Sequence, residues 1–213
     1  MRTDDLVNLL ATGVEPVRPS QVVRRHAAAL GLGLAGAIAL MANLLGVRAD
    51  LASAALQPMF WVKVAFVAAL VGAALLGALR LSRPGRRLAR VPLALAAPVF
   101  ALWALAALEL VRAGSGERGQ LFFGSTAQSC PLLIALLSAP LFVALMWVMR
   151  DLAPTRLRLA GAATGLLAGA LGALVYSLHC PESAAAFIGF WYLVGMLIPA
   201  VLGALLGPRL LRW

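Results

Sequence analysis

The sequence has few charged residues and few groups capable of chemistry. Charged residues make up 12% of the 213-residue chain and hydrophobic residues 62%, whereas a soluble domain has about 25% charged residues. Acidic residues are scarce, with 8 Asp and Glu against 18 Lys and Arg. This composition excludes an ordinary soluble domain. It indicates a membrane protein in which little length is left for a separate soluble domain.

The residue patterns of the common catalytic sites are also missing. The chain has 2 cysteines and 2 histidines, and it contains no Cys-x-x-Cys pair, no Ser/His/Asp arrangement, no paired carboxylates within an apolar run and no phosphate-binding loop. The segment Gly31–Gly36 formally matches Gly-x-Gly-x-x-Gly, but it lies inside an apolar run instead of between a strand and a helix. We therefore expect no enzyme and no catalytic residue, and we interpret these glycines as a helix-packing surface.

Long apolar runs are what the sequence does contain. Each is about 20 residues long, enough for a helix to cross a hydrocarbon core of about 30 Å, and the first is too long for the apolar region of a cleavable signal peptide. We predict an all-α membrane protein, a bundle of six transmembrane helices. The predicted spans cover approximately residues 27–47, 59–79, 91–111, 131–149, 159–178 and 184–206. The domain plan is an N-terminal segment at 1–26, a transmembrane domain at 27–207 and a tail at 208–213.

Within these runs, three features bear on packing and polarity. Gly161, Gly165 and Gly169 recur every four residues, the spacing that lets neighbouring membrane helices approach closely. Lys63 lies near the start of the second run, and we expect its side chain to extend to the lipid headgroups. Glu109 lies near the end of the third run, and we expect the same of it.

The basic residues predict the orientation of the chain. With six spans, both termini lie on one side, together with most of the Lys and Arg residues. The opposite side holds only Arg48, Lys63, Arg112 and Arg118. The positive-inside rule therefore predicts that both termini are cytoplasmic. Because the basic residues lie in short loops beside apolar runs, we interpret the net charge of +10 as this orientation signal and expect no direct contact with nucleic acid.

The N-terminal segment contains one short amphipathic pattern. Asp4 and Asp5 suit the first turn of a helix, and Leu6, Leu9 and Leu10 follow at helical spacing. A helix of about three turns is marginal in water and needs a partner for its apolar stripe. A frayed tail, a helix on the membrane surface and a helix that docks in a groove of another protein all fit this pattern.

The two cysteines are the reactive groups of the chain. Cys130 and Cys180 each precede a proline at the edge of an apolar run, and the predicted orientation places both outside the membrane, where disulfides persist. One interpretation is a structural disulfide that cross-links the bundle. A sensor of oxidants or metal is another, because thiolates are soft metal ligands and His179, with Glu182 nearby, adds a possible ligand beside Cys180. A small metal or solute transporter subunit is the alternative function, but its spans should carry polar groups at mid-membrane.

Four stretches resemble the NrsF family, long catalogued as a domain of unknown function. They are Met1–Val7 (MRTDDLV), Arg80–Arg87 (RLSRPGRR), Ser177–Glu182 (SLHCPE) and Leu205–Trp213 (LLGPRLLRW). The resemblance covers essentially the whole chain, and His-Cys-Pro-Glu is its most specific part. Pro208 stands where the family pattern suggests a second basic residue.

The resemblance implies a six-span anti-sigma factor of the inner membrane. Its partner would be an extracytoplasmic-function (ECF) sigma factor of the SigF type, held through residues 1–17, with Asp4, Asp5, Leu6, Leu9 and Leu10 as the contact residues. The resemblance also implies that Cys130 and Cys180 sense stress, with no resident cofactor and at most a transient metal ion at Cys130, Cys180 and His179. The oligomeric state stays open at this stage.

Overall fold

The computed structural model describes residues 3–11, 19–83 and 85–212, and before Ala27 it describes only some of the side chains. Throughout this part of the chain the regular elements are helical, without a strand. The π-helical segments are η1 (Met41–Leu45) and η2 (Ile188–Tyr192). The α-helices are α1 (Thr3–Ala11), α2 (Pro19–Leu40), α3 (Leu51–Ala54), α4 (Pro58–Leu81), α5 (Val91–Arg112), α6 (Arg118–Phe123), α7 (Cys130–Asp151), α8 (Leu157–Tyr176), α9 (Ala185–Phe187) and α10 (Leu193–Leu210).

Six helices in the described residues are long and apolar enough to cross a membrane, which confirms that part of the prediction. They cover Ala27–Leu45, Pro58–Leu81, Val91–Arg112, Cys130–Asp151, Leu157–Tyr176 and Ala185–Leu210. Two helix ends differ from the domain plan, because α2 begins at Pro19 and α10 continues through Pro208 to Leu210. Proline is tolerated in a first turn, where its missing N–H would have no helical partner.

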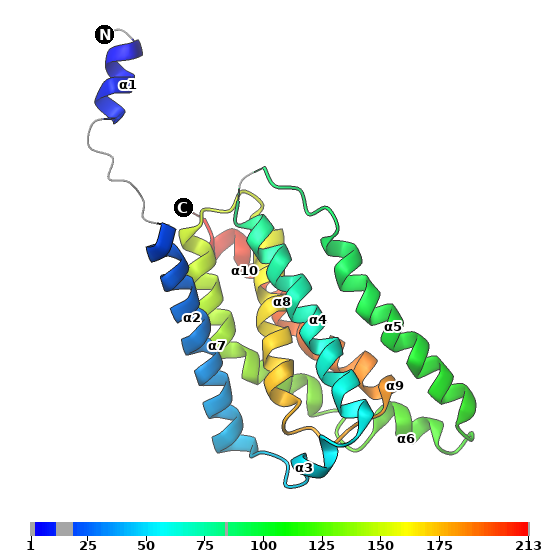
Figure 1. The fold of residues 1–213 in the computed structure, drawn as a ribbon. Coiled ribbons are helices and arrows are strands. Elements are labelled where there is room, and N and C mark those ends of the chain that lie inside the picture. The colour runs from blue at the N-terminus through cyan, green and yellow to red at the C-terminus, as the bar shows by residue number, and fades with distance from the viewer. Residues whose placement is uncertain (1–2, 12–18, 84, 213) are drawn as a thin grey trace.

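Helix α8 forms the centre of the bundle, between α4, α7 and α10 (Figure 1). Its glycine face packs directly on the backbone of α10. A methyl group added to Gly161 would overlap the carbonyl oxygen of Gly203, and one added to Gly165 would overlap that of Pro199. The predicted close packing at Gly161, Gly165 and Gly169 is therefore confirmed, and α10 is the partner helix.

The glycines of the first span also pack against a helix. An added methyl group on Gly33 would lie 3.1 Å from the Cα of Leu141, and one on Gly36 would lie 3.0 Å from the Cβ of Pro140. Both neighbours belong to α7. Gly33 and Gly36 thus form the predicted packing surface, against α7, whereas a methyl group added to Gly31 would meet no atom within 4 Å.

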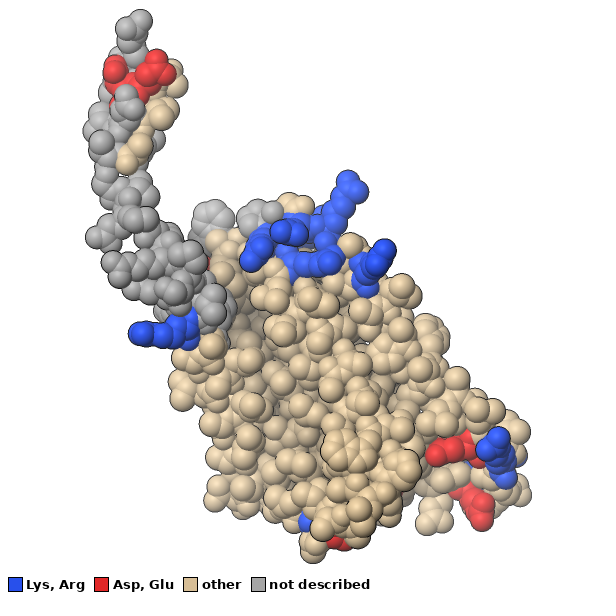
Figure 2. Space-filling view, in the orientation of Figure 1, with Lys and Arg blue, Asp and Glu red and all other residues tan. Residues whose placement is uncertain are grey.

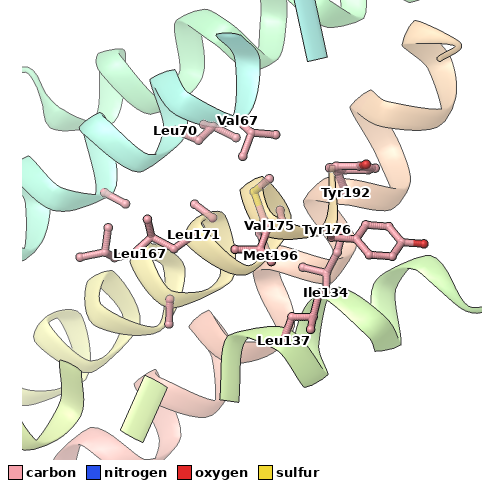
Figure 3. Close-up of a cluster of buried hydrophobic side chains, with 14 of the residues drawn as sticks. Val67, Leu70, Ile134, Leu137, Leu167, Leu171, Val175, Tyr176, Tyr192 and Met196 are labelled. Atoms are coloured by element: carbon pink, nitrogen blue, oxygen red, sulfur yellow. The ribbon is translucent and has the colours of Figure 1, made fainter. Parts of the chain in front are cut away.

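The core continues from α8 toward the loop that carries Cys180. Ile134, Leu137, Tyr176, Tyr192 and Met196 are fully buried there, and Figure 3 shows them clustered where α7, α8 and the last span meet. The core is therefore well packed beside the residues that follow α8.

The two ends of the bundle differ in charge. Figure 1 places the C-terminus, α1 and the α4–α5 loop at one end, and Figure 2 shows Lys and Arg gathered there. The exposed arginines of that loop are Arg83, Arg86, Arg87 and Arg90. The loop with Cys180 lies at the opposite end, beside α3 and α9. The charge separation thus follows the sequence pattern, and the cytoplasmic placement of the termini stays a prediction.

Candidate functional site: a buried pair of thiols

The fold brings together the two cysteines, which lie on different spans. Cys130 is the first residue of α7, and Cys180 lies in the loop Ser177–Ala184 between α8 and α9. Both are free and fully buried, and the Cys130 thiol lies close enough to Cys180 to affect its pKa. No disulfide joins Cys130 and Cys180 in this structure.

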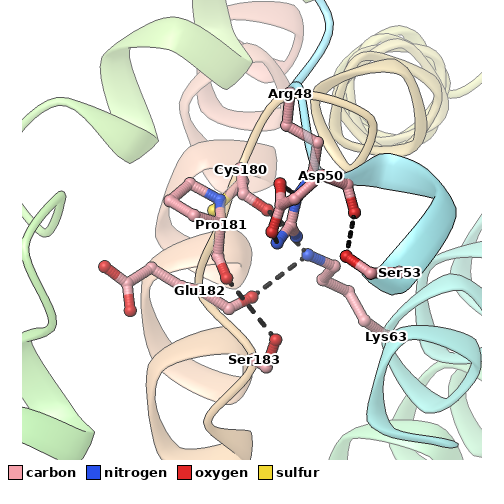
Figure 4. Close-up of polar contacts among 8 residues, drawn as sticks. All are labelled: Arg48, Asp50, Ser53, Lys63, Cys180, Pro181, Glu182 and Ser183. Carbon is pink, nitrogen blue, oxygen red and sulfur yellow. Dashed lines mark hydrogen bonds and ion pairs between the residues drawn. The ribbon is translucent and has the colours of Figure 1, made fainter. Parts of the chain in front are cut away.

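Two cations hold the backbone of Cys180 in place. Lys63 Nζ donates hydrogen bonds to the carbonyl oxygens of Cys180, at 3.0 Å, and Glu182, at 3.1 Å. Arg48 Nη1 donates to the same Cys180 oxygen at 3.2 Å, and its guanidinium also pairs with Asp50 at 2.6 Å. Figure 4 shows both cations converging on this carbonyl.

The position of Lys63 corrects the expectation that it extends to the headgroups. Its side chain is fully buried. The carbonyls of the Cys180 loop stand free of helical hydrogen bonding, and they supply the acceptors that a buried ammonium requires. A charged residue inside a membrane span often belongs to a functional site. The presence of Lys63 in the second span could therefore have identified this region from the sequence.

His179 and Glu182 attach the loop to two other segments. His179 Nδ1 lies 2.9 Å from the carbonyl oxygen of Gly46. The carboxylate of Glu182 accepts hydrogen bonds from the backbone N and the Oγ of Ser125, at 2.8 and 2.7 Å. Glu182 therefore links the Cys180 loop to the segment just before Cys130.

Glu109 also contacts this region. Its Oε2 accepts a hydrogen bond from the backbone N of Ala185 at 2.8 Å, at the first residue of α9. The carboxylate thus stabilises the start of a helix, where a negative charge is favourable. The side chain binds the protein here, which corrects the expected extension to the headgroups.

The predicted metal ligands are not gathered into a three-residue cluster. Across residues 3–11, 19–83 and 85–212, no three His, Cys, Asp or Glu side chains are grouped so that they could hold one ion. Thiolates favour soft ions, and a closed structural zinc site requires four ligands. Metal binding by Cys130, Cys180 and His179 therefore stays a prediction, in which the two neighbouring sulfurs would be the main ligands.

Two tyrosines complete the site, and the sequence reasoning missed them. The chain contains 2 tyrosines. Tyr176 and Tyr192 are both fully buried beside the thiols, with ring centroids 5.8 Å apart. The Tyr192 hydroxyl has no hydrogen-bond partner among the described residues. Tyr192 ends η2, and π-helical turns occur often at functional sites.

The surroundings of Cys180 favour its thiolate. The neighbouring Cys130 thiol lowers the pKa of Cys180 most, and the positive charge of Lys63 lowers it further, whereas burial opposes the shift. The net pKa of Cys180 lies below the ordinary thiol value. Since the thiolate is the nucleophile and the metal ligand, this shift favours reaction at Cys180.

Comparison with known proteins now adds a family. The model of the family described as NrsF, negative regulator of sigma F, matches residues 10–213. The chain belongs to the NrsF family. It is 57% identical to a probable anti-sigma-F factor NrsF of Azospira oryzae, and 39% identical to the anti-sigma-F factor NrsF of Caulobacter vibrioides. Both alignments cover the whole of each chain, and no solved structure matches.

Membership of the NrsF family confirms the resemblance and directs attention to the N-terminal segment. The structure forms the predicted short helix there as α1, with Asp4 and Asp5 exposed in its first turn. The side chains of Leu6, Leu9 and Leu10, and residues 1–2 and 12–18, lie outside the described residues. The sigma-contact assignment therefore stays a prediction.

Proposed function

We propose that this protein is a membrane-bound anti-sigma factor that holds an ECF sigma factor of the SigF type until Cys130 and Cys180 are modified. The observation that carries the proposal is the pairing of these two buried thiols in a member of a family of sigma-F regulators. The family supports the output, repression of a sigma factor. The thiol pair supports the input.

The sigma factor would bind the N-terminal segment, residues 1–17, on the cytoplasmic side of a bacterial inner membrane. The arginine-rich end of the bundle supports this side for the termini. Helix α1 carries exposed acidic residues and is too short to be stable alone in water. A groove in a partner would stabilise it.

The signal would be an oxidant or a soft metal ion that acts on the thiols from the periplasmic side. Free sulfur atoms stay about 3.5 Å or more apart by van der Waals repulsion, whereas a disulfide brings them to about 2.05 Å. Modification therefore changes the geometry at the junction of α7 and the Cys180 loop. In this proposal the metal ion is a signal and no cofactor resides in the protein.

A transcriptional reporter for the sigma factor tests the input. We expect Cys130→Ser, Cys180→Ser and the double variant to repress the reporter in unstressed cells and to lose its induction by peroxide or cadmium. Ser129→Ala, an exposed neighbour of Cys130, is the matched control and should respond like the wild type. Normal induction of the double variant would exclude the thiols as the sensor.

Co-purification tests the output. Full-length protein in detergent should retain the sigma factor, and a form that lacks residues 1–17 should not. Treatment with the thiol reagent should release the sigma factor from the full-length protein. If the shortened form retains as much sigma factor as the full-length protein, the docking segment is elsewhere.

A further inference from the structure

The Cys180 loop is bonded to the end of the first span. Arg48 N donates to the carbonyl oxygen of Leu178 at 3.2 Å, and Arg48 Nη1 donates to that of Cys180 at 3.2 Å. His179 Nδ1 lies 2.9 Å from the carbonyl oxygen of Gly46. These contacts all fall on the short segment Gly46–Arg48. Any displacement of the Cys180 backbone therefore acts on that segment.

The first span ends in a π-helical turn just before these contacts. Its closing hydrogen bond runs from Gly46 N to the carbonyl oxygen of Met41 at 2.9 Å, and Gly46 adopts a φ of 76°. A π turn holds one residue more than an α turn, and one residue corresponds to about 100° of rotation in a helix with 3.6 residues per turn. Conversion of η1 to α-helix would thus shift the helix register in one discrete step and not by gradual deformation.

The same span also contacts the helix that carries the other thiol. Gly33 packs on Leu141 and Gly36 on Pro140, both in α7, and α7 begins at Cys130. The first span is thus held at its end by the Cys180 loop and along its side by the helix of Cys130. In the chain, this span follows directly after the segment that carries α1.

We propose that η1 is the transmitter of the thiol signal, and that Arg48 is the positioning residue that connects it to Cys180. This inference rests on the proposed function. When hydrogen peroxide oxidises the pair, the two thiols lose two electrons and two protons, an S–S bond forms, and the peroxide leaves as two molecules of water. The sulfurs approach by about 1.5 Å, the Cys180 carbonyl moves with its cations, and η1 changes register, which rotates α2 relative to α7.

Three substitutions in the full-length protein test the connection. Arg48→Met should keep repression in unstressed cells and should still form the Cys130–Cys180 disulfide with peroxide, which mass spectrometry of the cysteine peptides checks. Its reporter induction should fall at least about tenfold, the range expected when a charge-assisted contact carries the coupling between two sites. Arg48→Lys keeps a cation and should restore induction. Arg118→Met, the matched control, removes an arginine that contacts the carbonyl oxygen of Ala113 instead of the Cys180 loop, and it should induce like the wild type.

Deletion of Asn43, an exposed residue within η1, tests the helix register directly. This variant also tests whether η1 is the transmitter if the Arg48→Met protein does not accumulate in the cell. It removes the extra residue of the π turn, so reporter activity should become independent of peroxide. If Arg48→Met or the deletion variant induces like the wild type, the transmitter assignment is wrong. If the wild-type protein fails to repress, or the double cysteine variant still induces, the proposed function itself is wrong.

Discussion

Gly161→Ala should destabilise the bundle, because its α8 backbone lies against the α10 backbone. An added methyl group would overlap the carbonyl oxygen of Gly203 and lie 3.1 Å from the Cα of Gly207. Backbone atoms cannot move aside as a side chain can, so the helices must separate. Overpacking of a core costs about 1–3 kcal/mol, whereas replacing glycine by alanine within a helix gains about 0.5–1 kcal/mol. The expected net loss is about 1 kcal/mol and at most about 2.5 kcal/mol.

The matched control for this substitution is Gly72→Ala. Gly72 lies inside the span of α4, and a methyl group added there meets no atom within 4 Å. It should therefore show only the gain in helix propensity. Unfolding in mixed micelles by titration with SDS, followed by tryptophan fluorescence, compares the two variants. A Gly161→Ala midpoint at or above that of Gly72→Ala would refute the close backbone crossing.

Three further predictions concern the thiol site. The pKa of Cys180 lies below its ordinary value, whereas the thiols of the denatured chain have a pKa of about 8.5. Alkylation of Cys180 in the folded protein should therefore reach its plateau at a lower pH than alkylation of the denatured chain. Mass spectrometry at each pH measures both. Lys63→Met removes a positive charge that favours the Cys180 thiolate, so its alkylation profile should shift to higher pH, and an unchanged profile would contradict the charge argument. Glu109→Gln weakens the hydrogen bond to Ala185 N, and we expect the unfolding midpoint to fall by the equivalent of about 1 kcal/mol.

The sequence was informative about the helices because lipid imposes a simple rule on them. A span must be apolar and about 20 residues long, and this rule found all six spans, although α2 begins at Pro19, well before the predicted start of the first span. The glycine spacing also predicted close crossings, because a four-residue repeat places small residues on one helix face. It did not identify α10 as the partner of α8, since any helix with a small face would satisfy the same pattern.

The polar part of the site was harder to predict, because its partners are backbone carbonyls. Lys63 and Glu109 were both expected at the headgroups, yet Lys63 binds the carbonyls of Cys180 and Glu182, and Glu109 binds the N–H of Ala185. Which carbonyls and N–H groups lie unpaired depends on where each helix ends. A difference of one or two residues in a helix end decides these contacts, and sequence patterns do not fix helix ends that closely.

Under the proposed function, burial of the thiols limits the agents that reach them and couples the site to its surroundings. With Cys130 and Cys180 fully buried, we expect a small oxidant or metal ion to react with them faster than a bulky thiol does. The contacts of Lys63, Arg48 and Glu182 that cover the pair also attach the loop to three different segments. A change in the thiols must therefore strain at least one of these attachments, because a close-packed interior transmits a displacement to its neighbours. An exposed pair on a free loop could react equally well and would move nothing else.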